Sequence, residues 1–110
     1  ESYGMRADVD YQRGYAPTVN HKRETDFLRD LARRFAGEEN VVDMPRPNMG
    51  SEDFAYFLEK RPGSYFMLGT KVSDDVKPLH HPAFDFNDDI LPVGVAFWTE
   101  LVEAYLPRPV

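Results

Sequence analysis

The chain contains no cysteine, so disulfide bonds and thiolate metal ligands are both excluded within it. It also has no excess of basic residues, because the formal net charge is −6. A nucleic-acid partner favours a basic surface and an anionic membrane gives no attraction to an acidic one, so neither partner is expected. No apolar run is long enough to span a bilayer and no segment resembles a signal peptide, which makes the cytoplasm the expected location.

Several catalytic and nucleotide-binding motifs are absent as well. The seven glycines form neither a GxGxxG nor a Walker loop, and HExxH and GxSxG do not occur. Hydrophobic residues make up 42% of the 110 positions, which excludes disorder and is enough for a small core. This length allows one small domain or a piece of a larger one. Because the chain starts at Glu1, without Met and inside a strong pattern, we expect it to be truncated.

The first eleven residues alternate with a period of two between mainly apolar and mainly polar side chains. Successive side chains of a strand point to opposite faces, so this alternation predicts a half-buried strand of an antiparallel sheet. The remaining sequence supplies few partners for such a strand. We therefore expect its partners to lie outside the chain.

The rest of the chain alternates between helical and strand-like patterns. Apolar residues at helical spacing over 27–35 predict a helix that ends at Gly37, and Ser51 is a candidate N-cap for a second helix. Residues 41–44 suit a short strand, 45–50 a loop, and 64–69 a strand buried on both faces. A final helix with Pro92 in its first turn should bury a wide apolar face, made of Val95, Trp98, Leu101, Val102 and Tyr105. This order predicts an α/β fold with helices flanking a mixed, mostly parallel sheet.

The sequence LHHP at residues 79–82 is the first candidate site. Neutral imidazole is a common metal ligand, and its second ring nitrogen usually donates to a carboxylate or carbonyl. His80 and His81 meet that need because they follow a predicted strand and precede three acids, Asp85, Asp88 and Asp89. Taken by itself, the spacing equally describes two exposed histidines in a turn.

The second candidate is the sequence GSEDF at residues 50–54. Gly50 and Ser51 at a helix start would expose backbone N–H groups that can hold a substrate carboxylate. Glu52 or Asp53 could act as a general base, but an ordinary capped helix predicts the same residues. His21, a lone histidine in a polar crossing segment, is expected to be solvated.

In order and spacing, residues 49–70 and 78–106 together resemble the C-terminal end of the hippurate hydrolase and indole-acetyl-amino-acid hydrolase family. That family belongs to the co-catalytic metallopeptidases, with carboxypeptidase G and aminoacylase. Residues 11–21 and 37–54 resemble its return from a lid domain into the catalytic domain. The resemblance implies that residues 1–15 are the last strand of a lid and dimerisation domain with its crossover. Residues 16–110 would then be the C-terminal part of the catalytic domain.

The resemblance also implies roles for single residues. His80 occupies the metal-ligand position of the family's Leu-His-(Ser or Asn)-Pro motif, and His81 replaces the small polar residue. A register shifted by one would make His81 the ligand instead. Gly50, Ser51 and Glu52 lie where the family shapes its substrate pocket. The base is a glutamate upstream of the matching region, so neither Glu52 nor Asp53 takes that role, and no catalytic residue is expected in this chain.

The implied activity is hydrolysis of an N-acyl amino acid such as hippurate by a homodimeric enzyme with two divalent metal ions, Zn, Mn or Co. A single imidazole cannot hold a metal tightly, so we expect the isolated chain to be inactive and without a tightly bound ion. Two other interpretations remain. One is a non-catalytic α+β interaction module, and the other is a small hydrolase with Glu52 and Asp53 as a carboxylate pair, although neighbouring helix residues do not face one another.

Overall fold

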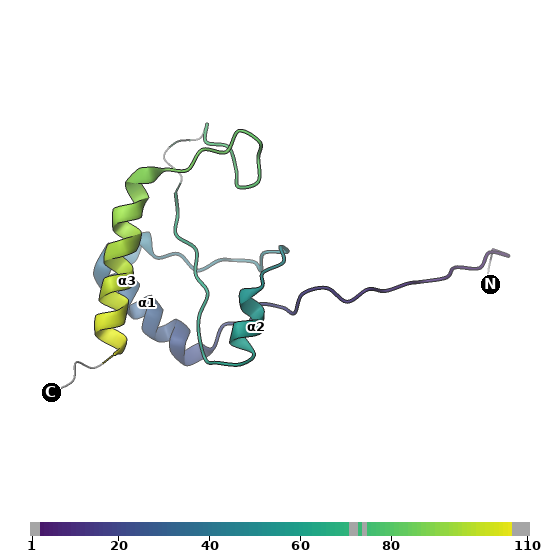
Figure 1. Ribbon diagram of the computed structural model, residues 1–110, viewed down its shortest axis with the longest axis horizontal. Helices are drawn as coiled ribbons and strands as arrows, with labels where there is room; N and C mark the ends of the chain where they lie inside the picture. The colour runs from purple at the N-terminus through teal and green to yellow at the C-terminus, as the bar shows by residue number, and fades with distance from the viewer. Residues whose placement is uncertain (1–2, 71–72, 74, 107–110) are drawn as a thin grey trace.

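The computed structural model describes residues 3–70, 73 and 75–106, and its regular elements are all helical (Figure 1). Three α-helices occur in this part of the chain: α1 (Lys22–Ala36), α2 (Phe54–Leu58) and α3 (Leu91–Tyr105). Two 3₁₀ turns, η1 (Glu38–Asn40) and η2 (Asp88–Ile90), flank them. None of the described helices is long and apolar enough to cross a membrane.

The helix predicted over 27–35 is confirmed as α1, and it ends where the sequence indicates. Gly37 follows the last turn with φ +92°, and its N–H donates to the carbonyl of Arg33. Such a φ is readily adopted only by glycine, because an L side chain would be strained there. The loop expected over 45–50 is also confirmed.

Helices α1 and α3 pack against each other at a steep crossing angle and run in broadly opposite directions (Figure 1). Phe27, near the start of α1, contacts Tyr105 at the end of α3, with ring centroids 5.5 Å apart. Phe35, near the end of α1, contacts Phe97 in the middle of α3 at 5.4 Å. Edge-to-face contacts of this kind stabilise a pair beyond the area they bury. Leu31 and Phe97 are buried at this contact, and Ala55 and Leu58 are buried on α2.

The predicted α/β fold is wrong for the residues that the structure describes, because none of them forms a strand. Residues 5–20 and 64–70 are neither helical nor paired into a sheet, and 41–44 form no strand either. A strand is stable only when a neighbour about 4.8 Å away takes up its backbone N–H and C=O groups. Alternation of apolar and polar side chains indicates which face of a strand would be buried, but it cannot supply the neighbouring strand.

Because residues 5–20 pair with no other strand among the described residues, their side chains are largely exposed. The N-terminal segment runs away from the helices in Figure 1, and the side chains of Tyr3, Val9 and Tyr11 are at least 80% exposed. The radius of gyration is 19.5 Å, compared with about 13 Å for a compact chain of this size. The division into two domains near residue 15 stays a prediction.

The apolar face predicted for α3 is not buried as expected. Val95 is 68% exposed and Trp98 56%, and Val102 and Tyr105 are also more than half exposed. Phe97, outside the predicted face, is the buried residue of this helix. The apolar residues of α3 spread over more than one face of the helix, and α1 covers mainly the face that carries Phe97.

Candidate functional site

His80 lies in the turn that follows residues 75–79, with its backbone in the left-handed region at φ +71°. Among the described residues, neither ring nitrogen of His80 has a hydrogen-bond or ion-pair partner, and the side chain is exposed. A non-glycine residue at positive φ is uncommon and costs about 1–3 kcal/mol unless its surroundings impose it. His80 therefore presents an exposed imidazole, without a partner among the described residues, on a turn with a left-handed backbone.

His81 is placed differently, because its ring is already engaged. The backbone N–H of Ala83 donates to Nδ1 of His81 at 3.0 Å, while the backbone N–H of His81 donates to the carbonyl of Pro78. A neutral imidazole that accepts at Nδ1 carries its proton on Nε2, which leaves no free lone pair for a metal. The geometry therefore favours His80 over His81 as a ligand.

The acids that follow the histidines do not orient them. Asp85, Asp88 and Asp89 line an open hollow of about 460 Å³ together with Asp75 and Lys77, and His80 is not part of its lining. The backbone N–H of Asp89 is capped by the side chain of Asn87. No group of three or more His, Asp or Glu side chains arranged to hold a metal ion occurs in the described part of the chain.

The second candidate segment does not form the helix cap that the sequence predicts. Helix α2 begins at Phe54, its N-cap is Asp53, and Ser51 precedes the helix without capping it. The backbone N–H of Phe54 instead donates to Oε1 of Glu52 at 3.0 Å. The backbone N–H of Gly50 is taken up by the side chain of Asn48 at 3.0 Å.

Glu52 is held as a carboxylate. Its pKa lies below the ordinary value, first because the Phe54 N–H donates to it and second because the Tyr65 hydroxyl does. The same contact raises the pKa of Tyr65, because an ionised phenol could no longer donate to the carboxylate. The side chain and the backbone of Asp53 also hydrogen-bond to Glu52, and each lowers its pKa by less than Phe54 or Tyr65 does.

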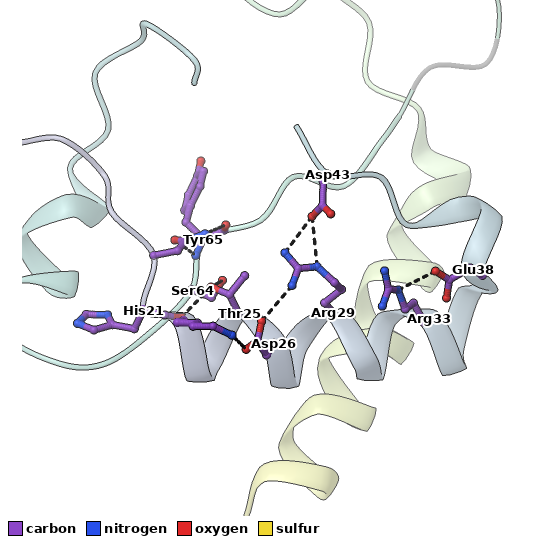
Figure 2. A network of polar contacts seen from close by, with 11 residues as sticks. His21, Thr25, Asp26, Arg29, Arg33, Glu38, Asp43, Ser64 and Tyr65 are labelled. Atoms are coloured by element: carbon purple, nitrogen blue, oxygen red, sulfur yellow. Dashed lines mark hydrogen bonds and ion pairs between the residues drawn. The ribbon is translucent and has the colours of Figure 1, made fainter. Parts of the chain in front are cut away.

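Sequence reasoning missed the partners of residues 63–65. His21, expected to be solvated, is half-buried, and its Nδ1 accepts the N–H of Gly63 at 3.2 Å. Thr25 and Ser64 join their hydroxyls at 3.1 Å in the same region (Figure 2). The partners are about 40 residues apart along the chain, so no local pattern signals the contact. The loop that carries His80 lies well apart from α2 in Figure 1.

Comparison with known proteins decides the family. Residues 5–104 match the model of peptidase family M20/M25/M40. The chain belongs to this family. The resemblance drawn from residues 49–70 and 78–106 is thereby confirmed. Family membership, together with the absence of strands among the described residues, favours a hydrolase over the α+β interaction module.

Individual relatives agree with this assignment. "Probable hydrolase sll0100" of Synechocystis is 36% identical over 97 residues, which are 86% of this chain and 25% of that protein. An IAA-amino acid hydrolase of Arabidopsis thaliana, ILR1-like 4, is 33% identical over 94 residues, which are 84% of this chain and 21% of that protein. Hippurate hydrolase of Campylobacter jejuni is 33% identical over 89 residues, which are 81% of this chain and 22% of that protein. The chain thus spans a quarter or less of these relatives, and no solved structure matches it significantly.

Proposed function

We propose that this chain is the C-terminal part of a metal-dependent amidohydrolase that cleaves N-acyl amino acids. Family membership supports a hydrolase, and relatives named hippurate hydrolase and IAA-amino acid hydrolase support an acyl amino acid as substrate. The single observation that carries the proposal in this chain is the exposed imidazole of His80, which has no partner among the residues that the structure describes. The longer protein would act in the cytoplasm as a homodimer.

The residues of this chain would have limited roles in that reaction. His80 would supply one imidazole to the metal centre, and the other ligands and the general base would come from the rest of the enzyme. Two divalent metals, when bound, would lower the pKa of a shared water and polarise the scissile carbonyl. Gly50, Ser51 and Glu52 would form part of the substrate pocket. The chain by itself would be inactive, because one ligand cannot hold an ion tightly.

A matched pair of variants tests the role of His80. Asparagine tolerates the left-handed backbone and offers an oxygen that can accept from a nearby N–H, so His80→Asn and His81→Asn both preserve the turn. In the enzyme that contains this chain, we expect His80→Asn to lower kcat/KM for hippurate with Zn or Mn by about 100-fold or more and to weaken metal binding. His81→Asn should stay within about tenfold of the unsubstituted enzyme.

The measurements are hydrolysis rates and the metal content of the purified protein. Equal losses in the two variants would show that the turn, rather than the His80 imidazole, is required. A greater loss in His81→Asn would assign the ligand to His81. Turnover of hippurate by the isolated 110-residue chain would contradict the proposal that the remaining ligands and the base lie elsewhere.

A further inference from the structure

Tyr65 links three segments that are far apart in the sequence. Asn20 precedes α1, Glu52 precedes α2, and Tyr65 follows α2. The side-chain amide of Asn20 donates from Nδ2 to the carbonyl of Tyr65 at 2.8 Å, and its Oδ1 accepts the N–H of Tyr65 at 2.7 Å. One amide thus satisfies both backbone groups of Tyr65, as a neighbouring strand would.

The contact continues on both sides of Asn20. The backbone N–H of His21 donates to the carbonyl of Gly63 at 3.0 Å, and the N–H of Gly63 donates to Nδ1 of His21. Thr25, one turn into α1, reaches Ser64. These five hydrogen bonds fix residues 63–65 against the start of α1, and Figure 2 shows the ring of Tyr65 directed away from that helix.

The side chain of Tyr65 then reaches the segment before α2. Its ring lies 5.7 Å from that of Phe54, centroid to centroid. Phe54 is also the residue whose N–H donates to Glu52. The Tyr65 hydroxyl interacts with the same carboxylate and contributes to the lowered pKa of Glu52, after the N–H of Phe54. The ring and the hydroxyl therefore act on the two residues that connect the 50–52 segment to α2.

We propose that Tyr65 is a positioning residue for the 50–52 segment: Asn20 fixes its backbone, and its ring and hydroxyl hold Phe54 and Glu52 in place. Glu52 then serves to anchor the segment, and contact with substrate falls to Gly50 and Ser51. This inference rests on the proposed function, because it takes the 50–52 segment to be part of the substrate pocket. It adds a residue outside that segment, on which the shape of the pocket depends.

Removal of single groups in the intact enzyme tests the inference. Tyr65→Phe deletes the hydroxyl and keeps the ring, and Tyr56→Phe makes the same deletion on α2, where no described residue pairs with the hydroxyl. We expect Tyr65→Phe to raise KM for hippurate about 3- to 10-fold while kcat stays within about twofold, because a loss of binding that is equal in the ground and transition states raises KM alone. Tyr56→Phe should leave both parameters unchanged.

Hydrogen exchange gives a readout that does not depend on turnover. The amide of Phe54 should exchange faster in Tyr65→Phe than in Tyr56→Phe, because Glu52 is then less firmly held. Asn20→Ala should change KM and exchange in the same direction. In the double variant Asn20→Ala/Tyr65→Phe, KM should rise less than the product of the two single effects, since both act through one contact.

Each result decides between the two proposals. If the unsubstituted enzyme does not hydrolyse acyl amino acids, the proposed function fails, and the exchange rate of Phe54 still tests whether Tyr65 holds the segment. Faster exchange with an unchanged KM in an active enzyme would overturn the inference, because the held segment would not shape the pocket. A lower kcat at constant KM would also overturn it, because the hydroxyl would then act in the chemical step.

Discussion

Asp26 lies between two cations on α1. Lys22, one turn before it, is ion-paired with it, and Arg29, one turn after it, lies 3.1 Å away and also reaches Asp43 at 2.9 Å (Figure 2). The pKa of Asp26 is lowered from its ordinary value, chiefly because Lys22 hydrogen-bonds to the carboxylate. Desolvation opposes this as the second-largest effect, and the charges of Lys22 and Arg29 lower the pKa further. Because these ion pairs are exposed, they contribute little to the free energy of unfolding and mainly determine the local charge pattern.

Replacement of Lys22 should be visible at Asp26. We expect Lys22→Ala to raise the pKa of Asp26 toward the ordinary value near 3.9, measured by NMR titration of the carboxyl carbon. Because the pKa is depressed in the folded state, the stabilising effect is present above the unfolded-state value and is lost as pH falls below about 4. Arg34→Ala, a removal of charge two turns further along the helix, is the control, and an Asp26 pKa that does not differ between the two variants would contradict the pairing.

At the scale of elements, the boundaries of the helices depend on backbone geometry. Gly37 ends α1 with φ +92° and ψ 150°, a combination that L side chains rarely adopt. A Cβ at this position would also lie 2.7 Å from the carboxylate of Glu39. The carboxylate can move, so the backbone conformation is the greater obstacle.

Gly37→Ala should therefore destabilise the end of α1. We expect a loss of about 1–3 kcal/mol in the free energy of unfolding, which urea denaturation followed by circular dichroism would measure. Gly14→Ala is the matched control, because a Cβ there meets nothing within 4 Å and its φ is ordinary. Equal stability of the two variants would show that the chain leaves α1 by another conformation.

At the scale of the whole molecule, one face of α3 stays more than half exposed, although Tyr105 contacts Phe27 and Trp98 contacts Phe66. Its exposed apolar residues repeat at intervals of four and three over the full helix: Leu91, Val95, Trp98, Val102 and Tyr105. A soluble monomer rarely leaves such a continuous apolar stripe in contact with water. The chain also spans only a fifth to a quarter of its relatives, so the proposed longer enzyme has ample polypeptide to cover this face.

The exposed stripe predicts how the isolated chain behaves in solution. Acrylamide should quench the fluorescence of Trp98, the single tryptophan, efficiently, and the chain should bind a hydrophobic dye. Val95→Lys with Val102→Lys should reduce dye binding about twofold or more without loss of helicity. Val42→Lys is the control, because Val42 is exposed but lies outside the stripe. Dye binding that is insensitive to the substitutions on α3 would show that this face is covered.

The sequence alone determined the features that local chemistry controls. The spacing of Phe27, Leu31 and Phe35 predicts α1, Gly37 marks its end, and Pro92 lies in the first turn of α3. The motifs around residues 49–70 and 78–82 indicate the family. The helix predictions succeed because helical periodicity and helix ends depend on residues only a few positions apart. The family is recognisable because the order and spacing of whole segments can be compared without knowing any contact.

Only the tertiary structure decided the features that need a distant partner. Alternation over the first eleven residues could not provide the neighbouring strand, and apolar spacing on α3 could not show which face α1 covers. The contact of Asn20 with Tyr65 spans 45 positions and leaves no trace in either local sequence. Backbone pairing and burial are properties of two surfaces in contact, and the sequence of one surface does not specify the other.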